Sequence, residues 1–498
     1  MYARAVCSLL IAFAPMLSAT LLAATPDFVP LVRRVEHAKD ITGHPFGTAI
    51  AVVKNGQVIY EAYLGYADIG KRRPVTRDTV FYIASATKPF FALNALLKEA
   101  AGELDTTTSL QQLFPDLRFA GFDAAAVTAR DLLTHTSGID DPPLVWATAF
   151  SGLHDARSRR ALVALATPDA EAAHGRFEYT NVGYNILSVW MDQRYAMPWQ
   201  RQLERAIFQP LGMRHTTASV SRAEAAGWVL AKPYSFASAR PAEPLYLTKS
   251  DATMHAAGGL LSTAPDLARF LITQLAGDGE PIARAVVARS HQPQAAVSSQ
   301  YLDFERSGYA WGWYTGTYKG RPMLHHFGGF VGFHAHLSFM PQDGIGLVVL
   351  NNDDALGAQL TNLIADYVYG VLLSEPEVEA RSAQRFGELE VKAAALRAKL
   401  AEQRKSIQSR AWNLSLPRER YVGTYTHAAL GDITLTLDQA QRPVLRWGRL
   451  SATATGAEQR DQLRIEWVPN SGEFVAFEVA DGEVKALVFD RITFGKSH

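Results

Sequence analysis

Strand-like segments at both ends of a long helical stretch are the feature that most restricts the folds open to this chain. Residues 48–67 alternate apolar and polar side chains around Asn55-Gly56, which is typical of a β-hairpin with a type I′ turn. From Ser85 to about Leu275 the periodicity is mostly helical, and strand patterns then return before a final amphipathic helix. The returning strands are Tyr309–Tyr318, Met323–His326, His334–Met340 and Ile345–Asn351, and the helix is about Leu356–Leu373.

The simplest arrangement of these segments is one sheet whose strands come from both ends of a domain, with helices inserted between them. We predict such a domain, α/β in class and of the α+β type, over residues 25–375. After Pro376 the chain is rich in Ala, Glu, Lys, Arg and Leu, and residues 376–412 are predicted to form an amphipathic connecting helix. Short strand patterns follow, so residues 413–498 are expected to form a small antiparallel β-barrel or sandwich.

The first 24 residues differ in composition from the rest of the chain. Arg4 is the only charged residue before Asp27, and the apolar run Ala5–Leu22 has small residues near its end. This pattern predicts a secretory signal peptide over residues 1–24, and hence an exported protein, periplasmic or secreted, with no stable membrane span in its mature form. An uncleaved membrane anchor is the alternative, because the apolar run is near the minimum length that spans a bilayer.

Charge and cysteine content limit the function classes that remain. The 498 residues include 49 Lys+Arg and 49 Asp+Glu, and a zero net charge gives no support for a nucleic-acid partner. The only cysteine, Cys7, lies in the predicted signal peptide, so the mature chain has neither a cysteine nucleophile nor a thiolate metal site. We therefore expect no nucleic-acid partner, and the candidate catalytic residues of this chain favour a small-molecule or peptide substrate.

The stretch Phe81–Pro89, FYIASATKP, places a serine where a strand-like run ends and a helical pattern begins. Lys88 is one helical turn after Ser85, so its amine can reach the serine hydroxyl. Serine becomes a nucleophile when a base takes its proton, and a lysine in a dry site with a lowered pKa can act as that base. A capping serine followed by a surface lysine gives the same pattern, so further motifs are needed.

Two later stretches supply such motifs. Tyr179-x-Asn181 offers a phenol for proton transfer and an amide that can bind a substrate, although a core tyrosine and a helix-capping asparagine look the same in sequence. The stretch His326-Phe327-Gly328-Gly329, at the end of a predicted strand, offers a free backbone N–H for an oxyanion, with a simple glycine turn as the alternative. His135 is expected to be structural rather than catalytic.

Two other catalytic arrangements fit the sequence poorly. No serine has a glycine two residues away on both sides, which disfavours a hydrolase of the Gly-x-Ser-x-Gly type. A metal site would have to use the histidines near the third motif, and no cluster of carboxylates lies beside them: His325, His326, His334 and His336. We expect neither a metal nor a cofactor.

The motifs Ser85-x-x-Lys88, Tyr179-x-Asn181 and His326-x-Gly328 resemble, in order and approximate spacing, those of the serine β-lactamase and penicillin-binding protein superfamily. The variant is that of class C β-lactamases, DD-peptidases and esterases, and the phrases LLTHTSGI, IFQPLGM, AAGGLLSTAPDLARF and HHFGGFVGF are also similar. The resemblance covers about residues 30–370, and the tail resembles the lipocalin-like β-domains of some members. It implies an antiparallel sheet flanked by helices, with an inserted helical subdomain.

The resemblance also implies a role for each motif residue. Ser85 would be the nucleophile and would form an acyl-enzyme, and Lys88 would help to deprotonate it. Tyr179 would be the base or the proton shuttle, and the division of the base role between Lys88 and Tyr179 stays open. Asn181 would bind the substrate amide, and the oxyanion would lie between the backbone N–H groups of Ser85 and Gly329.

The third motif departs from the Lys-Thr-Gly form of the superfamily. His326 replaces a fixed cation and is mostly neutral at pH 7, and Phe327 replaces a hydroxyl residue. The grip on a β-lactam or D-alanine carboxylate is therefore weakened, which favours action on esters, amides or D-residue peptides over a potent β-lactamase. The alternatives are a class C-like β-lactamase or DD-carboxypeptidase, and a cell-wall or β-lactam receptor that is acylated without turnover.

Overall fold

The computed structural model describes residues 26–276 and 281–497, and its larger part is built on one sheet. The strands of this sheet are β1 (Thr48–Lys54), β2 (Gln57–Leu64), β9 (Ala295–Tyr301), β10 (Phe304–Tyr309), β11 (Tyr314–Tyr318), β12 (Arg321–Phe330), β13 (Phe333–Met340) and β14 (Ile345–Asn351). They lie in the order β2-β1-β14-β13-β12-β11-β10-β9, and every neighbouring pair is antiparallel. The predicted hairpin is confirmed, because Asn55 and Gly56 have φ angles of 50° and 75°.

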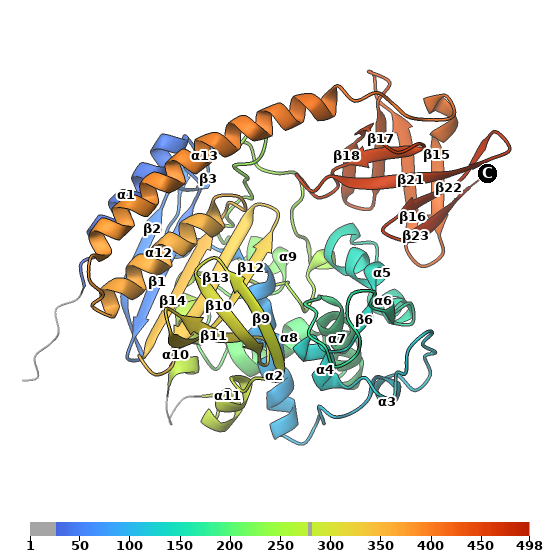
Figure 1. The fold of residues 1–498 in the computed structure, drawn as a ribbon. Coiled ribbons are helices and arrows are strands. Elements are labelled where there is room, and N and C mark those ends of the chain that lie inside the picture. The colour runs from blue at the N-terminus through green and yellow to red at the C-terminus, as the bar shows by residue number, and fades with distance from the viewer. Residues whose placement is uncertain (1–25, 277–280, 498) are drawn as a thin grey trace, which may run out of the picture.

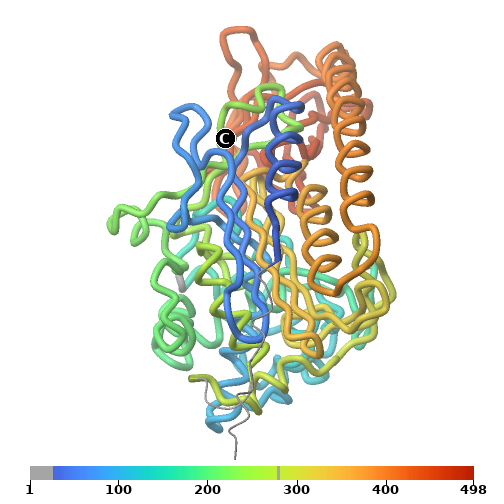
Figure 2. The backbone as a smooth tube through the Cα atoms, turned by 90° about the vertical axis from the view of Figure 1, so that its left-hand side faces the viewer, coloured from blue at the N-terminus to red at the C-terminus, as the bar shows by residue number. Residues whose placement is uncertain are grey.

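Both ends of the domain contribute to the sheet, as predicted. β1 pairs with β14, with Thr48 opposite Asn351, so the first strands complete a sheet begun by the last ones. The central strands are buried along nearly their whole length because helices cover both faces (Figure 2). One helical layer contains α1 (Val29–Thr42), α12 (Gly357–Leu372) and α13 (Val378–Gln408), and the other contains α2 (Lys88–Ala100), α10 (Ala264–Leu275) and α11 (Arg284–Ser290).

The predicted helical subdomain lies between α2 and α10. Its helices are α3 (Leu110–Leu113), α4 (Ala129–Thr134), α5 (Pro142–Trp146), α6 (Ala156–Val163), α7 (Val182–Arg194), α8 (Trp199–Leu203) and α9 (Val220–Ala225). Thr128 and Asp131 form a capping box at the start of α4, as the sequence indicates. The Thr263 hydroxyl caps α10 by accepting from the backbone N–H of Asp266.

One predicted strand is wrong. The segment Tyr309–Tyr318 is interrupted, since β10 ends at Tyr309 and β11 begins at Tyr314. Gly312, in the interruption, has a φ of 82° and lies so close to the backbone of Pro89 that a Cβ atom there would clash. β9 was not predicted, because its side chains are mostly exposed and show no apolar alternation.

α13 occupies the segment of the predicted connecting helix and leads to the C-terminal barrel (Figure 1). Its first half packs on the sheet domain, because Phe386, Leu389 and Ala393 are buried in one apolar cluster with side chains of α1 and α12. Farther along, Leu400 and Ile407 are only half-buried. The apolar stripe of α13 therefore belongs mainly to the core of the sheet domain.

The C-terminal strands curl into a nearly closed barrel, as predicted. They are β15 (Gly423–His427), β16 (Gly431–Leu437), β17 (Pro443–Trp447), β18 (Leu450–Thr453), β19 (Thr455–Gly456), β20 (Gln462–Ile465), β21 (Glu473–Ala480), β22 (Glu483–Phe489) and β23 (Ile492–Lys496). Their order is β18-β17-β16-β15-β23-β22-β21-β20-β19, and Ala454 alone joins the two outermost strands. The predicted strand Arg420–Tyr425 starts later, at Gly423, because Arg418–Tyr421 forms a 3-10 turn.

Trp146, at the end of α5, joins the barrel to the helical subdomain. Its ring centroid lies 4.8 Å from that of Phe489 and 6.0 Å from that of Trp447. Its Nε1 donates a hydrogen bond to Asp490 at 2.7 Å, so the polar edge of the indole is also satisfied. The barrel thus has a packed, hydrogen-bonded contact with the part of the chain that carries LLTHTSGI.

The predicted signal peptide, residues 1–24, lies outside the residues that the structure describes. Within residues 26–276 and 281–497, none of the helices combines the length and the apolar character needed to cross a bilayer.

Candidate active site

The segment around Ser85 has the predicted sequence of strand, turn and helix. β5 (Phe81–Tyr82) is followed by the 3-10 turn η1 (Ala84–Thr87), which runs directly into α2 with Pro89 in its first turn. Ala84 has a φ of 45°, which is uncommon for a residue with a Cβ atom, and it immediately precedes Ser85. Backbone strain of this kind is concentrated at functional sites.

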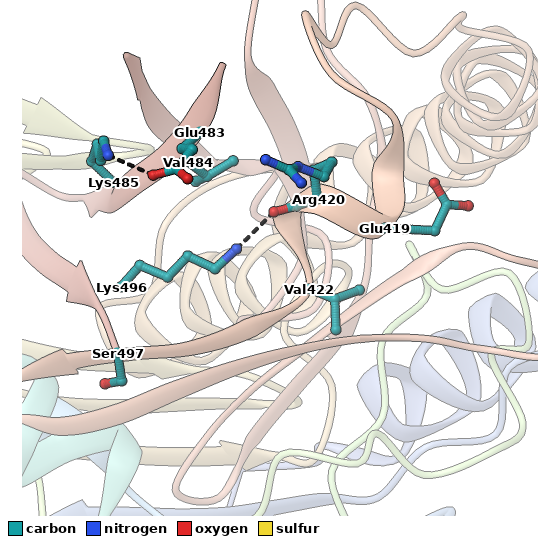
Figure 3. Close-up of a pocket in the computed structure, with 8 residues that line it drawn as sticks. All are labelled: Glu419, Arg420, Val422, Glu483, Val484, Lys485, Lys496 and Ser497. Atoms are coloured by element: carbon teal, nitrogen blue, oxygen red, sulfur yellow. Dashed lines mark hydrogen bonds and ion pairs between the residues drawn. The ribbon is translucent and has the colours of Figure 1, made fainter. Parts of the chain in front are cut away.

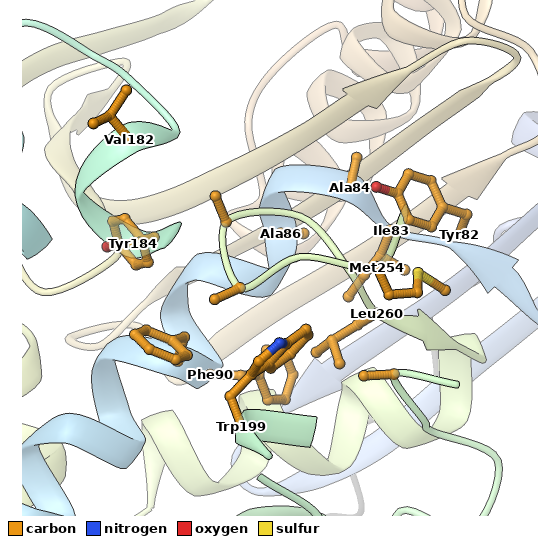
Figure 4. Close-up of a cluster of buried hydrophobic side chains, with 14 of the residues drawn as sticks. Tyr82, Ile83, Ala84, Ala86, Phe90, Val182, Tyr184, Trp199, Met254 and Leu260 are labelled. Atoms are coloured by element: carbon orange, nitrogen blue, oxygen red, sulfur yellow. The ribbon is translucent and has the colours of Figure 1, made fainter. Parts of the chain in front are cut away.

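The turn that carries Ser85 packs against a cluster of buried hydrophobic side chains. Residues 82–84, Ala86 and Phe90 belong to one cluster of buried hydrophobic side chains that also contains Tyr184 and Trp199 (Figure 4). Ser85 itself is half-buried, whereas the other residues of η1 are buried, so Ser85 is the residue of η1 that faces away from this cluster. The backbone N–H of Ser85 is in the first turn of the helical segment, where such groups have no partner within the helix.

Lys88 is fully buried beneath Ser85, and its Nζ atom has three oxygen partners. Nζ lies 2.8 Å from Asn181 Oδ1, 2.9 Å from the Ala257 carbonyl oxygen and 3.2 Å from Ser85 Oγ. The first two atoms can only accept hydrogen bonds, whereas the hydroxyl can donate one. An ammonium that donates to all three oxygens matches this set, and so does a neutral amine that donates to the first two and turns its lone pair to the Ser85 O–H.

Burial favours the neutral amine of these two. It lowers the pKa of Lys88 well below 10.5, and no carboxylate contributes an opposing effect. The Nζ atom instead lies 4.7 Å from the ring centroid of Tyr179 and 5.5 Å from that of Tyr184. These rings exclude water from the amine, and they come from the stretch of the second motif.

Tyr179 lies beside the serine in the opposite protonation state. Burial raises its pKa above 10, the charge of Tyr314 would raise it further, and a hydrogen bond to Ser85 acts in the opposite direction. The phenol therefore keeps its proton next to Ser85 Oγ. His135 packs against Tyr179 at 4.6 Å between ring centroids and accepts from the backbone N–H of Thr180 at 3.3 Å, which agrees with a structural role.

The third motif lies on β12, which approaches η1 very closely. A Cβ atom at Gly328 would be 1.9 Å from the Ile83 carbonyl oxygen and 3.0 Å from the Ala86 nitrogen, so only glycine fits. A Cβ atom at Gly329 would meet nothing within 4 Å, which indicates open space at this position.

The N–H of Gly329 has no partner in the sheet. The two-residue turn between Phe330 and Phe333 makes alternate residues of β12 bond to β13, and Gly329 falls on the other positions. Those positions face β11. The first residue of β11, Tyr314, lies opposite His325, so β11 does not extend as far as Gly329. The Gly329 N–H therefore points from an unpaired strand edge beside the turn that carries Ser85.

The two residues that replace Lys and Thr in the third motif point to opposite faces of the sheet, because successive strand residues alternate. His326 lies near Tyr179, with ring centroids 6.0 Å apart. Phe327 lies on the other face, in the cluster of α12, and stacks on His336 at 4.6 Å. The Phe327 ring therefore does not line the face that holds Ser85.

His326 presents an acceptor to the site. Its Nδ1 lies 2.8 Å from the carbonyl oxygen of Phe327, which can only accept, so Nδ1 carries the proton. Nε2 is buried and has no partner among the described residues. Burial lowers the pKa of His326 well below 6.5, so this residue offers a lone pair rather than a cation.

The histidines near the third motif do not converge on a metal. His325 stacks on Phe327 on the far face, whereas His326 faces Tyr179. Among the residues that the structure describes, no group of three or more His, Cys, Asp or Glu side chains could hold a metal ion. The pocket in Figure 3 lies in the C-terminal barrel and contains none of the motif residues.

Sequence reasoning missed three participants in the site. The carbonyl of Ala257 is a backbone acceptor, and nothing in AAGGLLSTAPDLARF marks it. Tyr314 stacks over Tyr179 at 6.1 Å, and the Arg306 guanidinium lies 3.7 Å from the Tyr314 centroid with Nε 3.0 Å from His325 Nε2. Arg306 lies on β10 and Tyr314 at the start of β11, the two strands whose boundaries the sequence did not show.

Comparison with known proteins indicates the same superfamily as the motifs do. A beta-lactamase family model matches residues 32–367. A penicillin-binding protein of Bacillus subtilis is 31% identical over 179 residues, which is 35% of this chain and only 38% of that protein. An unguisins hydrolase of Aspergillus campestris is 25% identical over 455 residues, 86% of this chain and 80% of that protein.

Similar structures extend the likeness to nearly the whole fold. The octameric penicillin-binding protein homologue from Pyrococcus abyssi matches with a TM-score of 0.60 at 20% identity, over 94% of this chain and 100% of that chain. The fold and the relatives define a serine hydrolase of the β-lactamase and penicillin-binding protein superfamily. The chain belongs to the beta-lactamase family.

Proposed function

We propose that this protein hydrolyses esters, amides or D-residue peptides through an acyl-enzyme on Ser85. The observation that carries the proposal is the contact set of Lys88 Nζ, which has two partners that only accept and one hydroxyl that can donate. This amine is placed to act as a base toward Ser85, and its burial lowers the pKa of Lys88 and so favours the neutral form that the base needs.

The contacts support a division of roles that the sequence left open. Lys88 takes the proton of Ser85 as Oγ attacks the substrate carbonyl carbon. The carbonyl oxygen becomes negative between the N–H groups of Ser85 and Gly329, which are fixed before the reaction. Tyr179, which holds its proton, gives it to the departing oxygen or nitrogen, and the proton on Lys88 restores the phenol. Water then releases the acyl group by the reverse path.

The proposed base predicts the pH dependence of activity. Because burial lowers the pKa of Lys88, kcat/KM rises with pH through that lowered pKa and reaches a plateau below pH 10.5. Lys88→Arg, which stays charged, removes activity at every pH. His326→Asn keeps the rise at the same pH, since the pKa of His326 already lies well below 6.5. Initial rates from pH 5 to 10 measure this, and a rise that disappears in His326→Asn contradicts the assignment.

His326 supports the choice of substrate class. A substrate carboxylate needs a donor or a cation at this position, and His326 presents a buried acceptor instead. An amide N–H, or an ester that makes no demand there, fits this lone pair better. The relative from Aspergillus campestris, which aligns over 86% of this chain, is likewise a hydrolase.

A side-by-side substrate panel tests the class. We expect clear turnover of p-nitrophenyl acetate, weaker turnover of a D-Ala-D-Ala peptide, and a cephalosporin kcat/KM about 10²-fold or more below the ester, because one or two charge-assisted hydrogen bonds are missing. His326→Lys should raise the cephalosporin-to-ester ratio by about tenfold or more. A wild-type cephalosporin kcat/KM of about 10⁴ M⁻¹s⁻¹ or above contradicts the proposal and implies that another cation, such as Arg306, binds the carboxylate.

A further inference from the structure

A second lysine lies beside the candidate site and has no role in the chemistry proposed above. The Nζ atom of Lys249 is 3.9 Å from the ring centroid of Phe330 and 5.3 Å from that of Tyr82. It donates to the carbonyl of Ala149 at 2.7 Å. Burial lowers the pKa of Lys249 well below 10.5, and no carboxylate within the described residues pairs with it. This amine therefore forms part of a wall without a fixed charge.

The same two rings border a cavity of about 260 Å³. Its other walls are mainly aliphatic and aromatic side chains, among them Leu247, Leu261 and Phe333. Of the two other charged side chains that border it, Lys232 is paired with Asp68 at 2.9 Å and Glu224 is exposed. A cavity of about 150 Å³ is enough to hold benzene, so this one has room for an aromatic ring and a short linker.

The cavity is placed next to the two backbone N–H groups of the site. Tyr82 is three residues before Ser85, Phe330 directly follows Gly329, and their rings are in edge contact at 5.3 Å. The two rings that form one cavity wall therefore come from the two segments whose N–H groups would bind the substrate carbonyl oxygen, Tyr82 from the Ser85 segment and Phe330 from the Gly329 segment.

The leaving group and the acyl group of a substrate lie on opposite sides of its carbonyl carbon, and the direction of β12 indicates where each of them would lie. Tyr179, which would protonate the leaving group, lies at the His326 end of the strand segment. Phe330 is four residues farther along, about 13 Å at the rise of an extended strand. A substrate with its leaving group at Tyr179 therefore extends its acyl group toward Phe330 and the cavity.

We propose that this cavity is the acyl subsite of the enzyme and that it selects substrates with an aromatic or medium-length aliphatic acyl group. The inference rests on the proposed hydrolysis at Ser85 and names the substrate side that the catalytic residues do not specify. The acyl group is held by burial against Leu247, Leu261 and Phe330, and the tip of Lys249 forms the wall at the Phe330 ring.

A series of p-nitrophenyl esters tests the subsite on the full-length protein. The ratio of kcat/KM for each ester to that for the acetate should rise about fourfold per buried methylene, to roughly 10² at hexanoyl, and phenylacetyl should match hexanoyl. Longer chains should gain nothing more, because the cavity is filled. Leu247→Trp, which fills the cavity, should lower the hexanoyl-to-acetyl ratio at least tenfold, and Leu247→Ala should move the best chain length toward octanoyl.

Leu245→Trp is the matched control, because Leu245 is two residues away and does not border the cavity. It should keep the wild-type ratio. Acetate turnover with a flat chain-length series, or equal ratios in Leu247→Trp and Leu245→Trp, overturns the subsite while leaving the hydrolase intact. Loss of acetate turnover in the wild type overturns the hydrolase proposal itself. If Leu247→Trp does not fold, Leu247→Ala decides through the position of the optimum.

Discussion

Replacing Ser85 with alanine is expected to lower kcat/KM for p-nitrophenyl acetate by about 10⁵-fold or more, and Lys88→Ala should cost nearly as much. In the proposed mechanism Ser85 Oγ and Lys88 Nζ act as one unit, with the amine as the base, and the two atoms lie 3.2 Å apart. Members of such a unit are strongly non-additive, so the double variant should lose no more than Ser85→Ala alone.

Lys98→Ala is the matched control for this series. Lys98 lies on the same helix, α2, but it is paired with Glu103 at 2.8 Å near the surface. Its loss removes a surface ion pair and should change kcat/KM by no more than about twofold. Initial rates on purified protein with circular dichroism as a check on folding measure all four variants. A Lys88→Ala enzyme that retains about a tenth of wild-type activity contradicts the base role.

Gly328→Ala is expected to lower kcat/KM by about 10²-fold or more and to destabilise the fold by about 1–3 kcal/mol. The added Cβ atom would lie 1.9 Å from the Ile83 carbonyl oxygen, so either β12 or η1 has to move. Either movement changes the distance between the N–H groups of Ser85 and Gly329, on which oxyanion stabilisation depends.

Gly329→Ala is the matched control for the loss of stability expected in Gly328→Ala. Its Cβ atom meets nothing within 4 Å, and Gly329 is not among the residues with positive φ. Its denaturation midpoint should therefore equal that of the wild type, whereas that of Gly328→Ala falls. Urea denaturation followed by fluorescence compares the two. Equal midpoints for Gly328→Ala and Gly329→Ala would mean that β12 does not approach η1 as closely as the structure shows.

Much of the site could be predicted because its chemistry requires particular residue types at fixed spacings. A strand followed by Ser-x-x-Lys places the amine one turn below the hydroxyl, and Lys88 is found there. Asn181 was expected to share the cleft, and its Oδ1 lies 2.8 Å from Lys88 Nζ. The Ala257 carbonyl could not be predicted, because a backbone acceptor leaves no mark in the amino-acid sequence.

The side of the sheet on which Phe327 lies can be predicted from its place in the strand, directly after His326. Adjacent residues on a strand point to opposite faces, so His326 and Phe327 cannot both line the cleft. Phe327 was interpreted as an altered carboxylate contact, and its ring instead packs in the second core at 4.6 Å from His336. Substrate selectivity is therefore expected to depend on His326 and its tautomer rather than on Phe327.

The fold was predictable where apolar alternation was strong and turns carried glycine. The Asn55-Gly56 hairpin and the helix near Leu356–Leu373 are both present, the latter as Gly357–Leu372. The break between β10 and β11 was hidden because aromatic residues continue through it, and Gly312 was its only sign. The barrel contact at Trp146 depends on tertiary packing between distant segments, which no local pattern reports.

Covalent labelling tests the central claim most directly. The full-length protein is treated with a fluorophosphonate, its intact mass is measured, and the modified residue is identified by peptide mapping. One adduct per chain on Ser85, absent from Ser85→Ala and much slower to form in Lys88→Ala, is the result predicted by a deprotonated lysine facing the hydroxyl. An adduct on another residue, or equal labelling of Ser85→Ala and wild type, contradicts an acyl-enzyme mechanism at Ser85.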